Sequence, residues 1–286
     1  MSRPRWWGTL LYVPLLYGIG WLVVRPMALL APGLRVDQLD LLGVVVAFAL
    51  LLLSLPARLR RAWNEPHAWI RLGVTATPAA AGRAFLRGLL KALLLLGGVS
   101  ALLLLSGQAR WSGSLSPAAW LNALALLLGV GFAEELLFRG WLWGELEQEC
   151  GPRRALLLQA LIFALLHPWY RAPGLAAVGL LGGLILLALA LALRRQADGG
   201  LLWGAVGLHG GLVGGWFALQ SGLLQLAPGS PAWLAGLDAG GGANPLGGVP
   251  GWLGLALLIL AQRTAVARAR RPSTGACRAS SRGARP

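Results

Sequence analysis

Long apolar runs recur along the whole sequence, and they constrain the fold more than any other feature. Eight runs rich in Leu and Ala approach or exceed the roughly 18 residues that indicate a membrane-spanning helix. The chain is 57% hydrophobic, and its charged fraction of 12% is about half that of a soluble globular domain. We therefore predict an all-α fold: a polytopic membrane helix bundle of about eight transmembrane helices.

The predicted spans are separated by polar or Gly- and Pro-rich segments. From the amino terminus they cover residues 6–24, 39–56, 89–106, 118–144, 155–170, 174–193, 200–226 and 251–266. The first run follows Arg3 and Arg5 and is longer than the apolar region of a signal peptide, about 7–15 residues, so we interpret it as a span. The sixth contains no polar side chain, and we expect it to face lipid.

This pattern divides the chain into four regions. Residues 1–116 hold the first three spans and a basic interfacial loop, 57–91. Within that loop, 78–91 suits either an amphipathic helix on the membrane surface or a solvated linker. Residues 117–226 form the core, in which Glu145, Glu147 and Glu149 mark a polar loop, and 227–266 form an outer loop and the last span. Residues 267–286 are a basic tail that we expect to be disordered.

The basic residues predict the orientation. With both termini in the cytoplasm, all but four of the 25 Lys and Arg residues fall on the cytoplasmic side, as the positive-inside rule requires. The four exceptions are Arg25, Arg35, Arg110 and Arg171. The net charge of +15 thus reflects membrane topology, and we expect no nucleic-acid partner, because no basic soluble domain is present to bind one. The two cysteines, Cys150 and Cys277, indicate neither a disulfide framework nor a metal cluster.

Few ionisable side chains lie inside the predicted spans, and such groups mark function by default because they are costly to bury in a membrane. They are Glu134, Glu135, His167 and His209, with Arg139 close by. Counted from the cytoplasmic ends of their helices, Glu134, His167 and His209 lie at depths of about 16, 20 and 16 Å. Three helices therefore bring one Glu and two His to a similar level, which predicts a common polar centre.

The two adjacent carboxylates are not equivalent. Glu135 and Arg139 are spaced i, i+4 in the favourable order for an ion pair. Glu134 points about 100° away and has no such partner, which makes it the candidate general base. A purely structural Glu–Arg–His network is the alternative. The sequence contains no His-Glu-x-x-His, no Gly-x-Ser-x-Gly and no Walker-type phosphate loop.

At these residues the chain resembles the CPBP family of intramembrane proteases, which includes the CAAX prenyl endopeptidases and the bacterial Abi proteins. The family's Glu-Glu-x-x-x-Arg motif matches Glu134, Glu135 and Arg139, and its Phe-x-x-x-His motif matches Phe163 and His167. Its third motif, His-x-x-x-Asn/Asp, matches only at His209, because the last position is Val213. The resemblance covers about residues 117–220.

The resemblance implies a mechanism. Glu134 and His167 would activate a water for attack on a peptide carbonyl, and His209 would stabilise the oxyanion, with Glu135, Arg139 and Phe163 in support. Val213 cannot donate a hydrogen bond, so half of the oxyanion hole is missing and hydrolysis would be weak. Trp216, Gln220 or backbone groups at the glycines are the alternatives for the missing donor. We favour a metal-independent Glu/His mechanism without a cofactor; the alternative is zinc held by Glu134, His167 and His209.

The predicted function is intramembrane peptide hydrolysis at the cytoplasmic half of the membrane, with a peptide or membrane-protein substrate. The alternatives are a non-catalytic membrane protein that binds a peptide or partner, as in immunity or regulation, and an ion-coupled transporter. The transporter would be expected to show two similar halves, and the sequence has none. The predicted location is the bacterial inner membrane, with the lipid bilayer as partner.

Overall fold

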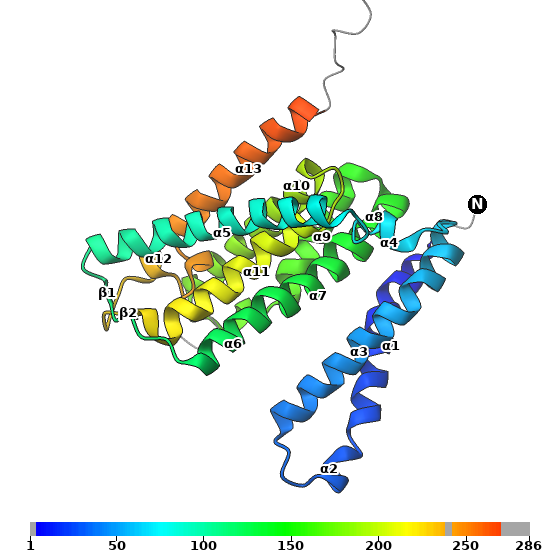
Figure 1. Cartoon of the computed structure of the whole chain (residues 1–286), viewed down its shortest axis with the longest axis horizontal. Helices are drawn as coiled ribbons and strands as arrows, with labels where there is room; N and C mark the ends of the chain where they lie inside the picture. The colour runs from blue at the N-terminus through cyan, green and yellow to red at the C-terminus, as the bar shows by residue number, and fades with distance from the viewer. Residues whose placement is uncertain (1–3, 238–241, 270–286) are drawn as a thin grey trace, which may run out of the picture.

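The computed structural model describes residues 4–237 and 242–269, and it is a bundle of helices (Figure 1). The long helices are α1 (Trp6–Val24), α3 (Val36–Arg58), α5 (Pro78–Leu105), α10 (Leu175–Ala197) and α13 (Val249–Ala269). Two shorter ones, α9 (Pro152–Leu166) and α11 (Trp203–Ala218), have 15 and 16 residues. The connections contain α2 (Met27–Leu30), η1 (Leu59–Trp63), α4 (Ala68–Arg71), η4 (Trp169–Arg171), η5 (Leu219–Leu223), α12 (Ala232–Ala235) and η6 (Pro245–Gly247). Strands β1 (Ala109–Trp111) and β2 (Leu224–Leu226) pair antiparallel.

The predicted all-α membrane bundle is confirmed. Within the described ranges, six helices are long and apolar enough to cross a membrane. The other two predicted spans correspond to α9 and α11, which are shorter than about 18 residues and reach less than the full hydrocarbon thickness. The number eight and the cytoplasmic location of the termini therefore stay predictions. Most of the predicted tail, including Cys277, lies outside the described residues, while residues 267–269 continue α13.

The fourth apolar segment forms one continuous helix with two π-helical stretches. It consists of α6 (Pro117–Ala125), η2 (Leu126–Val130), α7 (Gly131–Glu135), η3 (Leu136–Leu142) and α8 (Trp143–Cys150). The Ser116 hydroxyl caps its start by accepting a hydrogen bond from the Ala119 N–H, and Pro117 occupies the first helical position. The helix ends at Gly151, whose positive φ of 80° suits glycine. The prediction of a polar loop at residues 145–149 is wrong, because these residues belong to α8.

Helix α11 lies between α5 on one face and the α6–α7 region on the other (Figure 1). Glycines make both approaches possible: a Cβ atom on Gly207 would overlap the Phe85 carbonyl, and one on Gly210 would overlap the Leu127 carbonyl. Small residues thus allow the close helix approach that is typical of packing in membranes. It places His209 in the centre of the bundle.

Helix α10 corrects the prediction that the sixth apolar run faces lipid. It packs against α9, α11 and α13. Its buried residues include Leu180, Leu184, Leu187 and Leu191. A helix that is apolar on all sides suits a protein core as well as a membrane, and the interior of the bundle is as apolar as lipid. Composition alone could not distinguish the two positions.

Helix α5 corrects the interpretation of residues 78–91. The Thr77 side chain accepts a hydrogen bond from the Ala80 N–H and caps a single helix that runs to Leu105. Ala84, Gly88 and Ala92 are buried along its first half. Residues 78–91 are therefore helical, which contradicts the solvated linker, and they form the first half of the long helix α5, not a separate helix.

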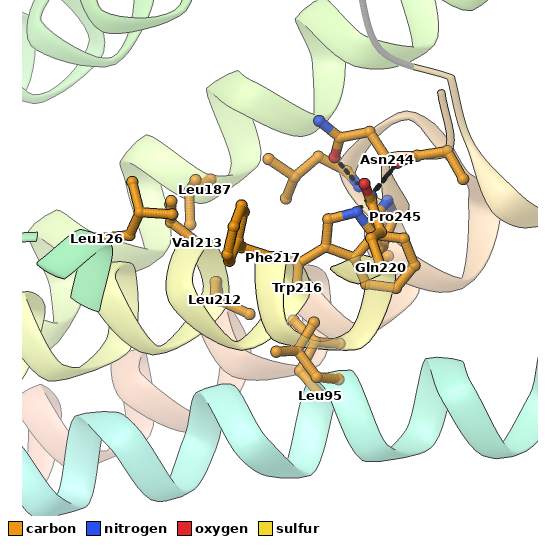
Figure 2. Close-up of a pocket in the computed structure, with 14 residues that line it drawn as sticks. Leu95, Leu126, Leu187, Leu212, Val213, Trp216, Phe217, Gln220, Asn244 and Pro245 are labelled. Carbon is orange, nitrogen blue, oxygen red and sulfur yellow. Dashed lines mark hydrogen bonds between the residues drawn. The ribbon is translucent and has the colours of Figure 1, made fainter. Parts of the chain in front are cut away.

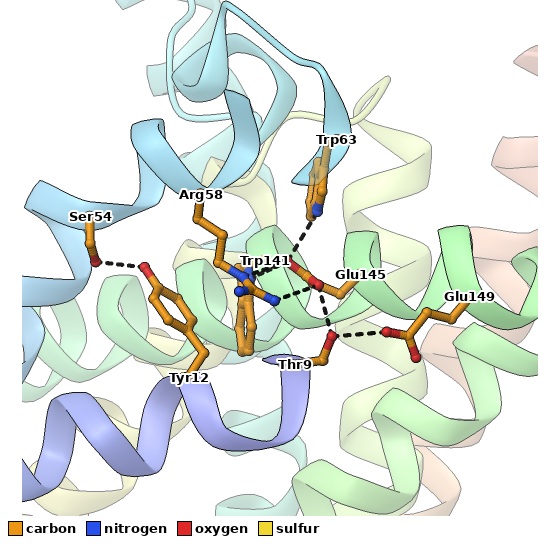
Figure 3. A network of polar contacts seen from close by, with 8 residues as sticks. All are labelled: Thr9, Tyr12, Ser54, Arg58, Trp63, Trp141, Glu145 and Glu149. Carbon is orange, nitrogen blue, oxygen red and sulfur yellow. Dashed lines mark hydrogen bonds and ion pairs between the residues drawn. The ribbon is translucent and has the colours of Figure 1, made fainter. Parts of the chain in front are cut away.

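The α1–α3 hairpin joins the bundle through a buried carboxylate. Glu145 has no exposed side-chain surface and accepts hydrogen bonds from Arg58 Nε and Nη2 at 2.8 and 2.9 Å. It also accepts from Trp141 Nε1 at 2.8 Å, Trp63 Nε1 at 3.1 Å and Thr9 Oγ1 at 2.8 Å (Figure 3). At its α2 end the hairpin stands apart from the bundle (Figure 1). Glu145 thus marks the end at which the hairpin is held.

Candidate active site

Glu134 lies in the five-residue segment α7, between the π-helical stretches η2 and η3. Single π-helical turns inside α-helices occur frequently at functional sites because they change the direction of the following side chains. Gly131, one turn before Glu135, faces Gly210 of α11 with no room for a Cβ atom between the two backbones. The two glycines therefore bring the helix with the carboxylates directly against the helix with His209.

His167 lies immediately after α9, in extended conformation with φ −86° and ψ 152°. Pro168 favours this conformation at the residue before it, so the helix stops at Leu166, earlier than the predicted end at residue 170. The His167 Nδ1–H donates to the Phe163 carbonyl at 2.7 Å, since a carbonyl can only accept. Its Nε2 atom is left free and faces Glu134.

His209 is held in the same way by a different acceptor. Its Nδ1–H donates to Glu135 Oε1 at 2.8 Å, and the same oxygen accepts from Arg139 Nη1 at 2.8 Å. Glu135 and Arg139 have no exposed side-chain surface, and His209 has 3%. Glu135 therefore neutralises Arg139 and fixes the tautomer of His209, whose Nε2 atom also faces Glu134.

The structure brings Glu134, His167 and His209 together. Glu134 Oε2 lies 3.6 Å from His167 Nε2 and 3.8 Å from His209 Nε2. These separations exceed a direct hydrogen bond and leave room for one small bridging group. Glu134 Oε2 is buried and has no hydrogen-bond partner among the described residues. Two imidazoles thus present the same nitrogen to one carboxylate oxygen that is free to act on a ligand.

The Phe163 side chain packs against both histidines of the site. Its ring is fully buried and lies 4.4 Å from the His167 ring and 5.8 Å from the His209 ring, measured between centroids. The Arg139 guanidinium carbon stands 4.2 Å from the centroid of the same ring, a cation–π contact. Replacement of this ring would loosen both imidazoles and remove a contact of the buried cation.

One side of the site is accessible from outside the protein, and the other side is buried in the bundle. The side chains of Glu134 and His167 are 29% and 27% exposed, whereas those of His209, Glu135 and Arg139 are buried. A substrate would therefore meet Glu134 and His167 first, with His209 behind them. The predicted site residues are all in one cluster, but their catalytic roles remain predictions.

Val213 lies one turn after His209 and lines an apolar cavity of about 270 Å³ (Figure 2). Leu126, Leu187 and Phe217 lie around it. Trp216 Nε1 and Gln220 Nε2, the two side chains predicted as substitutes for the missing donor, both donate to the Ala243 carbonyl, at 3.0 and 2.6 Å (Figure 2). They hold the loop before η6 against η5 in this structure, which commits their N–H groups away from the site.

The sequence did not indicate that Glu145 and Arg195 are buried. Glu145 stands among alternating polar residues that predict a loop, and Arg195 follows the predicted span 174–193. The structure buries both. The signal for Glu145 was its position at i+4 from Trp141 on a continuing helix; Arg195 had no distinguishing sequence signal.

The three side chains at the centre of the site can be compared with the ligands that zinc requires. Glu134, His167 and His209 offer an oxygen and two nitrogens of the type that zinc prefers. Among the described residues, however, no group of three His, Cys, Asp or Glu side chains has an arrangement that could hold a metal ion. The residues thus have suitable chemistry without a ready-made ligand geometry, and dependence on zinc stays a question for experiment.

Two family models match separate parts of the chain. Residues 1–67 match a domain of unknown function (DUF8676), which covers the α1–α3 hairpin and η1. Residues 114–214 match the model described as type II CAAX prenyl endopeptidase Rce1-like, and this stretch contains Glu134, His167 and His209. No curated protein and no solved structure shows significant similarity to the chain. The apolar helices indicate an integral membrane protein, and its residues 114–214 are similar to the Rce1-like type II CAAX prenyl endopeptidases, a family of membrane proteases.

Proposed function

We propose that the protein is an intramembrane endopeptidase that hydrolyses a peptide bond with a water activated by Glu134 and His167. The observation that carries the proposal is the convergence of two histidine Nε2 atoms on the free oxygen of Glu134, inside the Rce1-like domain. A general base must lie within hydrogen-bond reach of the proton that it removes, directly or through one water. A water bridging Glu134 Oε2 and His167 Nε2 would satisfy this requirement.

The proposed reaction follows from these positions. Glu134 takes a proton from the water, whose oxygen attacks the peptide carbonyl carbon and forms a tetrahedral oxyanion. Protonated Glu134 then gives its proton to the leaving nitrogen, the C–N bond breaks, and a carboxylic acid and an amine are released, which ionise to a carboxylate and an ammonium group. His167, fixed by its bond to the Phe163 carbonyl, orients the water and the carboxylate.

The oxyanion would be stabilised by His209. When protonated, its Nε2–H points toward the reacting centre while Nδ1–H stays bonded to Glu135. Val213 contributes no donor at the next turn, and Trp216 and Gln220 are bonded to Ala243. Because loss of one oxyanion donor costs about 10²–10³ in turnover, we expect a slow protease.

The test is peptide cleavage by the purified full-length chain in liposomes, with prenylated and unprenylated peptides and with transmembrane peptides as substrates. We expect Glu134→Gln, His167→Ala and His209→Ala each to lower turnover by about 10²-fold or more, without loss of folded protein. His67→Ala is the matched control, because His67 is exposed and does not belong to the cluster of site residues. Cleavage that is equal in all four variants and the wild type would refute the assignment.

A second function is favoured by the apolar cavity at Val213. An apolar side chain stands where the family places a hydrogen-bond donor, and the cavity that it lines could hold an apolar segment without hydrolysing it. The protein would then be a non-catalytic binder of a peptide or partner. Binding of a labelled peptide that persists in Glu134→Gln, with no cleavage by the wild type across the substrate set, would favour this function.

A further inference from the structure

Arg195 is a buried cation without a carboxylate partner among the described residues. Its guanidinium donates to three backbone carbonyls: Gly200 at 3.0 Å from Nε, Arg71 at 3.2 Å from Nη2, and Arg139 from Nη1. The residue is 7% exposed. Carbonyl oxygens accept hydrogen bonds from three of its N–H groups, and none of the ion pairs among the described residues includes Arg195, whereas buried charges in proteins are normally paired.

Other buried charges in this protein are paired, which makes Arg195 distinctive. Arg139 pairs with Glu135 at 2.8 Å, the neighbouring Arg194 pairs with Asp198 at 2.7 Å, and Glu145 pairs with Arg58 at 2.8 Å. Asp238 is the one Asp or Glu side chain that lies outside the described residues. A bound anion would supply the negative charge that Arg195 lacks among the described residues.

A cavity adjoins this charge. It has a volume of about 290 Å³ and is lined by side chains from four separate elements: Arg71 of α4, Trp143 and Glu147 of α8, Arg195 of α10 and Val266 of α13. This volume is about that of ten water molecules, enough for a phosphate group and part of a headgroup. The cavity thus offers room beside the unpaired cation.

The charged side chains that line the cavity suit a ligand with one negative charge. Arg71 is half-exposed and lies 3.8 Å from Glu147, which is too long for a hydrogen bond, so its guanidinium retains free donors. Two guanidinium groups and one carboxylate leave a net charge of +1. The indole N–H of Trp143, a residue that lines the cavity and is 4% exposed, has no partner among the described residues.

We propose that this cavity binds the phosphodiester group of an anionic phospholipid. It lies at the arginine-rich end of the bundle, which the charge distribution predicts to be the cytoplasmic surface, where lipid headgroups are present. Basic pockets between transmembrane helices on this side are suited to anionic headgroups. The phosphodiester of phosphatidylglycerol carries the one negative charge that the cavity lacks, whereas the choline cation of phosphatidylcholine cancels the charge of its phosphodiester. The bound lipid would tie α4, α8, α10 and α13 together.

The test measures lipids retained by the purified full-length chain in native mass spectrometry, after addition of phosphatidylglycerol or phosphatidylcholine. We expect phosphatidylglycerol to be retained in preference to phosphatidylcholine. Arg71→Gln should weaken its retention about fivefold, the effect of one arginine near a headgroup. Arg195→Gln should weaken it at least as much. If Arg195→Gln does not fold, Arg71→Gln and Trp143→Phe carry the test, because neither removes the buried cation.

The matched control is Arg60→Gln, which removes one positive charge from an exposed arginine that does not line the cavity. The proposal is supported if Arg60→Gln keeps the wild-type retention. It is overturned if the two lipids are retained equally, or if Arg60→Gln weakens retention as much as Arg71→Gln does. Displacement of the lipid by millimolar inorganic phosphate would overturn the lipid assignment in favour of a site for free phosphate. These readouts do not depend on peptide hydrolysis.

Discussion

Removal of the Glu145 side chain should release the α1–α3 hairpin from the bundle. In the variant Glu145→Ala, Arg58 loses both of its hydrogen bonds to the carboxylate while only 18% of its side chain is exposed. The indole N–H groups of Trp63 and Trp141 and the hydroxyl of Thr9 lose the same acceptor. One carboxylate therefore satisfies donors from α1, α3, η1 and η3, and a single substitution removes the acceptor from all of them.

The magnitude follows from burial. Breaking a buried ion pair by removing one partner costs about 3–5 kcal/mol, because the other charge stays buried and unpaired. Each indole N–H left without an acceptor costs about 1–3 kcal/mol, unless water reaches it. Since the partly exposed edge of Arg58 admits water, we expect a total near the low end of this sum, about 5 kcal/mol of unfolding free energy.

The assay is unfolding of the purified chain in mixed micelles with increasing SDS, followed by Trp fluorescence. The exposed pair Arg35–Asp37 provides the control: its side chains are 71% and 66% exposed, so Asp37→Ala should cost less than about 1 kcal/mol. The double variant Arg58→Met/Glu145→Leu should be destabilised by at least about 2 kcal/mol less than the sum of its single variants, since it leaves no unpaired charge.

Two results would refute this reasoning. The first is a loss in Glu145→Ala no larger than that in Asp37→Ala, which would mean that water replaces the carboxylate at little cost. The second is strict additivity in the double variant, which would mean that Arg58 and Glu145 do not interact energetically despite the 2.8 Å contact.

Three further predictions concern the site. Val213→Asn should raise peptide turnover, by up to about 10²-fold, because it adds a donor one turn after His209. Equal turnover in Val213→Asn and in Val213→Leu, which has a similar shape and no donor, would count against an oxyanion role at this position. Peptide cleavage should persist in the presence of a zinc chelator, whereas loss of activity that added zinc restores would establish the metal-dependent alternative. Gly210→Ala should lower the SDS unfolding midpoint and the turnover together, because its Cβ would meet the Leu127 carbonyl, while Gly98→Ala, where no atom lies within 4 Å of the added Cβ, should change neither.

The cluster of site residues could be predicted from the sequence, because ionisable side chains inside a membrane are costly to bury and therefore tend to lie together, away from lipid. Glu135 and Arg139 are one turn apart on a helix, so their contact needs no knowledge of the fold. Glu134, His167 and His209 come from three helices, and the prediction that they meet rested on their similar depth in the membrane. The 3.6 and 3.8 Å separations agree with that depth estimate.

Contacts between segments that are far apart in the chain could not be predicted from the sequence. Arg58 and Glu145 are 87 positions apart, and nothing in either segment indicates the other. The burial of α10 could not be predicted either. An apolar helix has no hydrophobic preference for other helices over lipid, so its position in the bundle depends on close packing against small residues of its neighbours. The cavity beside Arg195 could not be predicted for the same reason, because its lining residues come from four separate elements and share no local sequence pattern.

The early end of α9 links the fold to the proposed chemistry. A helix leaves its last four carbonyls without intrahelical partners, and this is costly where water is scarce. Pro168 has no N–H to continue the pattern, and the His167 N–H bonds to Ala164, so the Phe163 carbonyl is left open. The His167 side chain fills that vacancy with its Nδ1–H at 2.7 Å. The bond that completes the helix end therefore also fixes the tautomer that turns Nε2 toward Glu134, and the same local geometry serves stability and the site.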